Sequence, residues 1–168
     1  MIYNSRFPHH PISMTRAIFG ISFCVLIFAT GSINSQAQTV SGSIVNETAR
    51  RGASTSGVIV LDIPNELHVN SNQPKSEYAI PTTVRISGKG VKLSPVTFPP
   101  GENRKFQFSE NPINVYEGTV FFWYTVTVPK GYKGDSISIK AVVRYQACTN
   151  EVCYPPKNKE VTITARVT

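Results

Sequence analysis

Two cysteines near the C-terminal end of the chain are the residues whose type and spacing could do chemistry. Cys148 and Cys153 bracket four residues, and two prolines follow one residue after Cys153. A pair of thiols this close in sequence can form a disulfide, and a thiolate can exchange with the disulfide of a partner protein. The pair is therefore either a working dithiol or a structural staple, and the function of the chain depends on which it is.

The segments on either side of the cysteines show the alternation of strands. Apolar side chains take every second position in residues 137–147 and again in residues 161–167, with mostly polar side chains between them. A period of two is typical of half-buried strands, and four residues are an ordinary hairpin loop. The cysteines are therefore predicted at the tip of a β-hairpin. Cys148 shares the polar positions with Arg144 and Gln146, which indicates a place outside the core.

The hairpin register predicts an irregularity close to the cysteines. If Cys148 lies directly opposite Cys153, then Ile139 lies opposite Thr162, and a core position faces a surface position. A slip of one residue removes this conflict. We therefore predict a β-bulge between Cys153 and Val161, where the two prolines cannot donate hydrogen bonds to a strand ladder.

The remainder of the chain is predicted to be all-β. No stretch shows a helical period, and short strands at this spacing favour an immunoglobulin-like β-sandwich with a cysteine-bearing C-terminal hairpin. Trp123 and Tyr145 are predicted core residues, whereas His68 is predicted at the surface or in a turn. The further predicted strands are residues 40–45, 58–63, 67–70, 83–87, 91–98 and 115–128, with a loop at 47–56 and an ambiguous segment at 105–108.

An apolar run at residues 17–29 predicts export of the chain. A basic residue precedes the run, no acidic residue occurs before residue 47, and Ser35 and Ala37 place small residues at the positions that a signal peptidase reads. This pattern is typical of a secretory signal peptide. The alternative is a membrane anchor, but the run is shorter than the ~20 residues of a spanning helix. We expect a signal peptide at residues 1–37 and one domain at residues 38–168, periplasmic or extracellular after cleavage near Ala37.

Composition argues against several classes of function. The formal net charge is +7, but the charges are scattered singly, which is typical of a solvated surface rather than a nucleic-acid site. Residues 38–168 contain one histidine, two cysteines and no methionine. These side chains cannot assemble a four-ligand zinc site or a methionine-rich copper site. We expect no metal, no small-molecule cofactor and no nucleic-acid partner.

A family resemblance rests on the cysteine motif. Tyr-Gln-Ala-Cys-Thr-Asn-Glu-Val-Cys-Tyr-Pro-Pro, residues 145–156, resembles the motif of the N-terminal exported domain of the thiol:disulfide interchange protein DsbD. Residues 68–74 followed by 80–84 are similar to a second region of that family, and residues 115–118 are similar to a third. The resemblance implies an immunoglobulin-like sandwich and a thiol–disulfide exchange module that relays electrons between redox partners. It also implies that Cys153 faces the partner and that Cys148 resolves the mixed disulfide.

The same resemblance implies a cap loop and the kind of partner. In the family an aromatic residue of the cap covers the cysteines, and the matching segment here is residues 104–112. Phe106 and Phe108 are the candidate cap residues, and Phe108 is favoured because it is closer to the polar turn; the alternative is that both are ordinary core. In larger members a membrane domain and a thioredoxin-like domain follow. We therefore expect thioredoxin-like or membrane-embedded redox proteins to act in trans.

The rival interpretation of the cysteines is structural. Exported proteins accumulate structural disulfides, so the alternative is a non-catalytic immunoglobulin-like binding module with a disulfide staple. Closing so short a loop contributes only ~2 kcal/mol, however, and opposed strand positions hold Cβ atoms ~4.5–5.5 Å apart where a disulfide prefers ~3.8 Å. Strained, exposed disulfides are easily reduced. We therefore favour a protein thiol–disulfide oxidoreductase or electron carrier; a third class is an accessory subunit of a larger redox assembly.

Overall fold

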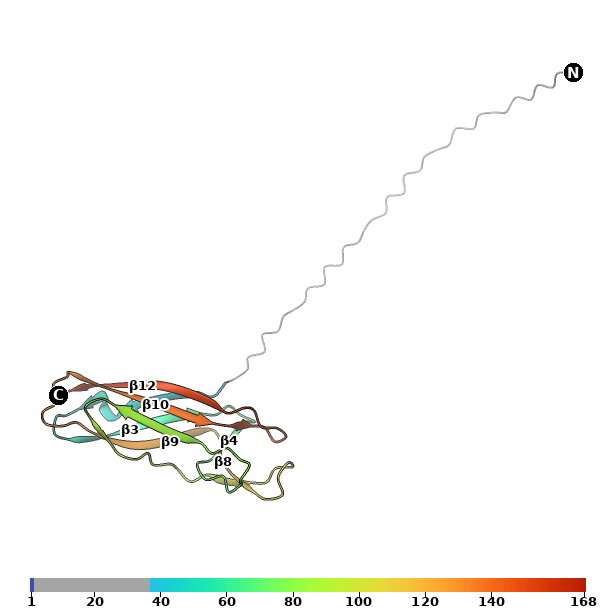
Figure 1. Cartoon of the computed structure of the whole chain (residues 1–168), viewed down its shortest axis with the longest axis horizontal. Coiled ribbons are helices and arrows are strands. Elements are labelled where there is room, and N and C mark those ends of the chain that lie inside the picture. Colours follow the sequence, from blue (N-terminus) through green and yellow to red (C-terminus); the bar gives the residue numbers. More distant parts are fainter. Residues whose placement is uncertain (2–36) are drawn as a thin grey trace. The chain divides into compact units, whose positions relative to one another are not determined.

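The structure, a computed structural model, describes Met1 and residues 37–168, so the predicted signal peptide lies almost wholly outside the described residues. Among these residues, no helix has the length and apolar character needed to cross a membrane. The elements are strands and one 3-10 turn (Figure 1): β1 Thr39–Ile44, η1 Val45–Glu47, β2 Thr48–Ala49, β3 Ser54–Asp62, β4 His68–Asn70, β5 Thr83–Gly88, β6 Lys92–Leu93, β7 Glu102–Arg104, β8 Ile113–Tyr116, β9 Thr119–Thr127, β10 Ser136–Tyr145, β11 Ala147–Cys148 and β12 Lys157–Val167.

Two four-stranded sheets form a sandwich. One has the order β1-β3-β9-β6 and the other β2-β12-β10-β5, and neighbours are antiparallel except for β2, which runs parallel to β12. The inward-facing apolar residues of β3, β9, β10 and β12 form one buried cluster between the sheets. Burial of these alternate positions is the main term that stabilises the sandwich. The predicted all-β, immunoglobulin-like fold is confirmed.

A third, smaller sheet carries the cysteine strand. Its order is β11-β4-β8-β7, and every residue of β4, β8 and β11 is buried. Figure 1 shows β4 and β8 toward the end of the sandwich opposite the C-terminus. The chain reaches this sheet by leaving β10 after Tyr145 and pairing Ala147 and Cys148 with β4. The disulfide is therefore built next to three buried strands of a short sheet, whose edge strand β7 is exposed.

The predicted slip in the hairpin register is confirmed. Ile139 pairs with Ile163 rather than with Thr162, although Cys148 pairs with Cys153. Two residues between Tyr145 and Cys148 thus lie opposite the three residues Tyr154, Pro155 and Pro156. The extra residue falls at the prolines, where no ladder hydrogen bond is lost.

The longest predicted strand, residues 115–128, is two strands that belong to different sheets. β8 ends at Tyr116 and β9 begins at Thr119, and the chain turns between them at Gly118, whose φ is +62°. This left-handed conformation is readily adopted by glycine. The turn lets one sequence run serve both the third sheet and the sandwich.

Two other predicted segments differ from the structure. Residues 47–56 include β2 and the start of β3, because polar Ser54 and Thr55 pair with β9 near the rim of the sheet, where the Ser54 and Thr127 hydroxyls are 2.7 Å apart. Residues 91–98 contain only β6 and a bridge from Thr97 to Trp123. Pro95 lies between them and has no N–H to donate to a ladder.

The burial predictions were right for Tyr145 and wrong for Trp123 and His68. Tyr145 is fully buried, but Trp123 is 46% exposed, because β9 buries Phe122 and turns Phe121 and Trp123 outward. His68 is only 2% exposed, since β4 lies inside the third sheet between β11 and β8. Alternation within one strand does not say which of its faces is the inner one.

Candidate functional site

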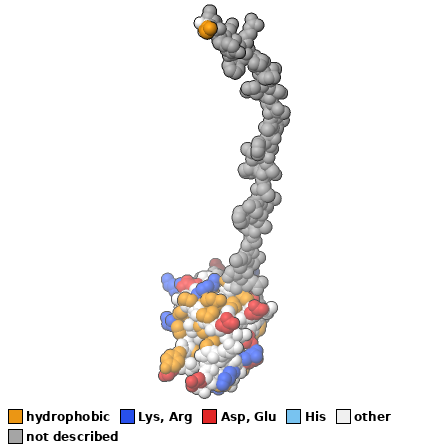
Figure 2. Space-filling model, turned by 90° about the vertical axis from the view of Figure 1, so that its right-hand side faces the viewer, with side chains coloured by type: hydrophobic (Ala, Val, Ile, Leu, Met, Phe, Trp, Pro, Cys, Tyr) orange, Lys and Arg blue, Asp and Glu red, His pale blue; other side chains and the backbone are white. Residues whose placement is uncertain are grey.

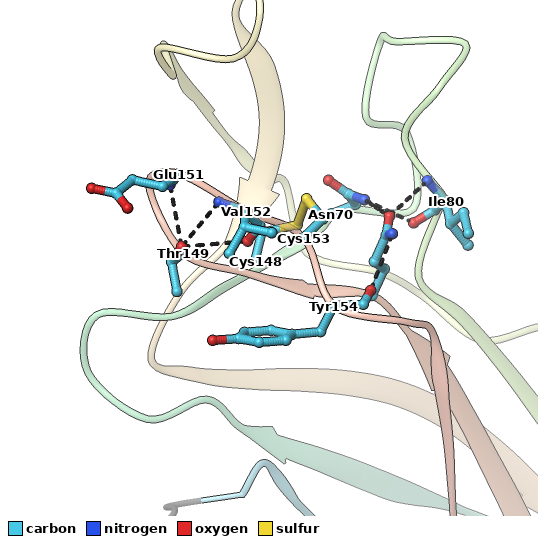
Figure 3. Close-up of a disulfide and its surroundings, with 9 residues drawn as sticks. Asn70, Ile80, Cys148, Thr149, Glu151, Val152, Cys153 and Tyr154 are labelled. Atoms are coloured by element: carbon cyan, nitrogen blue, oxygen red, sulfur yellow. Dashed lines mark hydrogen bonds between the residues drawn. A yellow bond between two sulfur atoms is a disulfide. The ribbon is translucent and has the colours of Figure 1, made fainter.

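The candidate site is the disulfide between Cys148 and Cys153 (Figure 3). Two backbone hydrogen bonds of 2.8 Å flank the cysteine pair. The N–H of Thr149 donates to the carbonyl of Val152, and the N–H of Tyr154 donates to the carbonyl of Ala147. The cysteines are thus a non-hydrogen-bonded pair, the kind at which antiparallel strands approach most closely. Their Cα atoms are 4.0 Å apart, so the wide pair expected from the sequence is not found. Reducibility must therefore be argued from exposure and surroundings.

The turn between the cysteines is organised by the side chain of Thr149. Its hydroxyl oxygen accepts hydrogen bonds from the backbone N–H groups of Glu151 (3.2 Å) and Val152 (3.1 Å). These local bonds satisfy a tight turn that contains no glycine or proline. The loop is therefore closed by its own polar groups and not by the disulfide alone.

The two cysteines differ in burial. Cys148 is 0% exposed within β11, whereas Cys153 is exposed at the end of the turn. The prediction from parity that Cys148 lies outside the core is wrong. Its strand leaves the sheet of β10 after Tyr145 and pairs with β4, where every residue of both strands is buried and parity no longer separates core from surface. A partner in solution can approach the pair only from the side of Cys153.

A network of amides fixes the base of the cysteine hairpin. Asn70 Nδ2 donates to Gln146 Oε1 (3.1 Å) and to the carbonyl of Ile80 (3.1 Å), and Gln146 Nε2 donates to the carbonyl of Tyr154 (3.2 Å). Figure 3 shows Asn70 beside the disulfide and Ile80 on the far side of this network. Sequence reasoning missed Asn70 and Gln146 as site residues, although both lie inside the segments that carried the family resemblance.

The two candidate cap residues lie in one aromatic stack. The rings of Phe106 and Phe108 are nearly parallel with centroids 5.2 Å apart, and Phe106 also stacks on the ring of His68 with centroids 4.2 Å apart. Phe106 is buried in a small cluster with Ile113 and Val115, whereas Phe108 is 44% exposed. The stack therefore extends from the interior of the third sheet to the surface.

The outer end of this stack borders a cavity next to the exposed cysteine. The cavity has a volume of about 220 Å³, and Phe108, Cys153, Tyr78 and Ile113 are among its lining residues. Phe108 therefore shares a hollow with Cys153, while Phe106 lies deeper in the fold. The two predicted cap residues are brought together with the cysteines, in unequal positions; the cap role itself stays a prediction.

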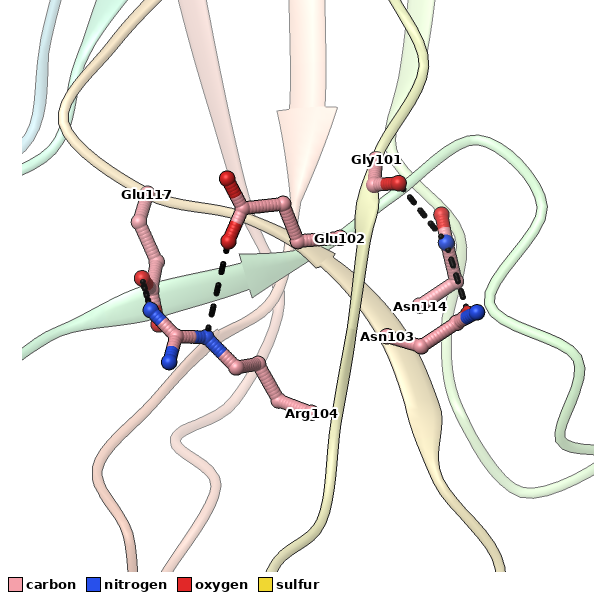
Figure 4. A network of polar contacts seen from close by, with 6 residues as sticks. All are labelled: Gly101, Glu102, Asn103, Arg104, Asn114 and Glu117. Carbon is pink, nitrogen blue, oxygen red and sulfur yellow. Dashed lines mark hydrogen bonds and ion pairs between the residues drawn. The ribbon is translucent and has the colours of Figure 1, made fainter.

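Charged residues hold the start of the cap segment in place (Figure 4). Arg104 Nη2 lies 2.5 Å from Glu117 Oε2, and Arg104 Nε lies 3.7 Å from Glu102 Oε2. Asn114 Nδ2 donates to the carbonyl of Gly101 and to Asn103 Oδ1, both at 3.0 Å. Arg104, the first residue of the cap segment, thus lies between two carboxylates.

Comparisons with known proteins identify a family. The family model described as thiol:disulfide interchange protein DsbD, N-terminal, matches residues 39–165. The N-terminal domain of DsbD from Neisseria meningitidis, solved in the reduced form, is 21% identical over 69% of this chain and 85% of that chain, with a TM-score of 0.42. No curated protein sequence matches.

A second solved structure shows the shared fold. The N-terminal periplasmic domain of ScsB from Proteus mirabilis is 11% identical, and the TM-score is 0.51. The match covers 79% of this chain and 48% of that chain, so this chain spans about half the length of the solved Proteus domain.

Proposed function

Because the chain belongs to the family of the N-terminal domain of the thiol:disulfide interchange protein DsbD, we propose that it relays electrons between redox partner proteins through Cys148 and Cys153. The observation that carries the proposal is the unequal burial of the pair, with Cys153 exposed and Cys148 enclosed. A single exposed sulfur gives a partner one point of attack and leaves the second sulfur protected for resolution.

The proposed exchange conserves atoms and electrons in two steps. A partner thiolate attacks Sγ of Cys153, the Cys148–Cys153 bond breaks, and Cys148 leaves as a thiolate that takes up a proton. The partner's second thiolate then attacks the mixed disulfide, releases Cys153 and leaves the partner oxidised by two electrons. In the reverse direction Cys153 attacks a partner disulfide and Cys148 resolves it. Because the two sulfurs are adjacent, resolution is effectively unimolecular.

Exposed apolar side chains around Cys153 favour docking of a protein. Tyr78 and Phe108 line the cavity next to Cys153, and Val152 and Tyr154 flank it in sequence; all four are exposed. Figure 2, which views the molecule from this end, shows hydrophobic side chains among charged ones on the surface. Such a patch around a reactive group suits transient contact with thioredoxin-like or membrane-embedded redox proteins in trans.

As a purely structural element, the disulfide would add little to the stability of the fold. Its loop is closed by Thr149, and its base is held by the Asn70–Gln146 network. Loop-closure entropy for so short a ring contributes only ~2 kcal/mol. The rival binding module would keep its function without the disulfide, whereas an exchange module would lose it.

The proposed setting is outside the cytoplasm. The predicted signal peptide and cleavage near Ala37 would export the domain, and the Proteus relative is a periplasmic domain. In an oxidising compartment, unprotected thiols are readily oxidised. A domain that must carry electrons there needs its cysteines to react with chosen partners more readily than with chance oxidants.

The test of the function is electron transfer between proteins. The oxidised chain is mixed with a reduced thioredoxin-like protein, quenched with acid and alkylated, and the mass added to each protein is measured over time. Transfer within seconds to minutes supports the relay. A pair that stays oxidised while the same thioredoxin reduces a control disulfide contradicts it.

The proposed cap predicts faster alkylation when Phe108 is shortened. In the reduced protein, Phe108→Ala should raise the rate at which iodoacetamide modifies Cys153 by at least about threefold, because a larger fraction of molecules is then open. Phe121→Ala is the matched control, since Phe121 is equally exposed on β9 and does not line the cavity. If Phe108→Ala and Phe106→Ala both leave the rate unchanged in a folded protein, no aromatic cap acts from this segment.

A further inference from the structure

The inner end of the aromatic stack is a histidine on the strand next to the buried cysteine. His68 pairs with Cys148 across the β4–β11 ladder, and its ring lies 4.2 Å from that of Phe106 at an interplanar angle of 14°. Phe106 in turn stacks on Phe108, which borders the cavity of Cys153. One continuous set of rings thus connects the neighbourhood of Cys148 with that of Cys153.

The surroundings of His68 contain both signs of charge. A polar cavity of about 400 Å³ is lined by His68 and Phe106 together with the charged residues Glu66, Arg104, Lys105 and Glu117. Arg104 and Glu117 form an ion pair with each other, and the amine of Lys105 donates to the carbonyl of Glu110. Burial lowers the pKa of His68; Glu117 opposes this shift and Arg104 adds to it.

We propose that His68 positions the aromatic cap and makes its opening depend on pH. The neutral imidazole stacks on Phe106 and holds Phe108 beside Cys153. The imidazolium, which is poorly solvated in the stack, turns toward Glu117 in the polar cavity and releases Phe106 and Phe108. This inference rests on the proposed cap over a redox-active pair. It adds a pH dependence of cap opening, which the cysteine motif does not predict.

The direction of the effect follows from the two states of the cap. In the closed state His68 is 2% exposed and its pKa lies below the ordinary 6.5, whereas in the open state the ring meets water and titrates near that value. The closed state is therefore fully favoured above the ordinary pKa and loses stability as the pH falls through 6.5 toward the lower value. Attraction between an imidazolium and the face of Phe106 opposes release, but it does not replace the water that a buried charge loses.

The test measures how fast the disulfide of the full chain is reduced by tris(2-carboxyethyl)phosphine across the range in which histidine titrates. His68→Phe keeps a ring that can stack but cannot take up a proton. The ratio of the wild-type rate to the His68→Phe rate should be close to one at about pH 8 and rise at least about threefold by about pH 5. A ratio that stays flat over this range overturns the proposal. Taking the ratio removes the pH dependence of the reductant itself.

A second comparison shows whether His68 acts through the cap. In a Phe108→Ala background, the same ratio should be flat, because the ring that His68 holds in place is gone. If the ratio still rises at low pH, His68 acts by another route and the proposal fails. The phosphine needs no protein partner, so these outcomes do not depend on whether the pair exchanges with thioredoxin-like proteins.

A titration keeps the proposal testable if His68→Phe does not fold. The pKa of His68, followed by NMR of its ring protons, should rise toward 6.5 in Phe106→Ala, because the stacking partner that buries the ring is removed. An unchanged pKa in a folded Phe106→Ala variant would mean that the stack does not control the protonation of His68, and would overturn the proposal.

Discussion

Replacing Cys148 by serine is expected to turn the domain into a trap for its partner, whereas replacing Cys153 by serine is expected to abolish exchange. In the first variant the exposed Cys153 can still attack a partner disulfide, but no neighbouring thiol resolves the product. In the second variant the remaining sulfur belongs to Cys148, which is 0% exposed and cannot reach a partner. Both substitutions remove the Cys148–Cys153 disulfide, but only Cys148→Ser should leave a lasting mixed disulfide with the partner.

The trap is measured by mass spectrometry under non-reducing conditions. Each reduced variant is mixed with an oxidised thioredoxin-like protein, with Cys24 replaced by serine throughout so that the sulfur of interest is the one left. A persistent mixed disulfide with Cys148→Ser and none with Cys153→Ser is the expected result. Equal amounts from both variants would show that burial does not assign the roles of the two sulfurs.

The second large effect is expected in the sandwich core. Phe122 is fully buried and packs edge-to-face against Phe98 and Tyr116, with ring centroids 5.3 Å and 6.0 Å away. Phe122→Ala should lower the free energy of unfolding by ~3–5 kcal/mol, through lost burial and the cavity left behind. Phe121→Ala removes the same type of side chain from the outer face of β9 and should change the free energy of unfolding by no more than about 0.5 kcal/mol.

Urea denaturation of both variants measures this difference. The midpoint should fall strongly for Phe122→Ala and hardly at all for Phe121→Ala, with similar slopes. Comparable losses for the two variants would mean that the assignment of inner and outer faces on β9 is wrong. The sandwich that supports the third sheet would then have a different set of side chains in its core.

The hairpin could be predicted from sequence because strand periodicity is exact. The apolar positions around Ile139 and Ile163 can face each other only if one residue is extra near the prolines, and the structure places it there. Register is a local property of two paired segments. The strands of the sandwich are recognisable for the same reason, since their side chains alternate between core and water.

The third sheet escaped prediction because its strands are short and three of them, β4, β8 and β11, are buried at every residue. Cys148 is therefore buried although alternation places it among the polar positions, and His68 is buried although a turn follows it in the sequence. The partnership of Asn70 with Gln146 depends on strands that meet only in the folded chain. Local patterns identify strands, but the burial of these residues is decided by which sheets cover them.

The reduction potential of the Cys148–Cys153 disulfide tests most directly whether this bond carries electrons. The oxidised and reduced fractions are measured after equilibration with dithiothreitol or thioredoxin at a series of potentials, while near-ultraviolet circular dichroism follows the fold. We expect a potential above about −300 mV and reduction without unfolding. A potential below about −300 mV, or a domain that unfolds when the bond is reduced, would show that the disulfide is a structural staple.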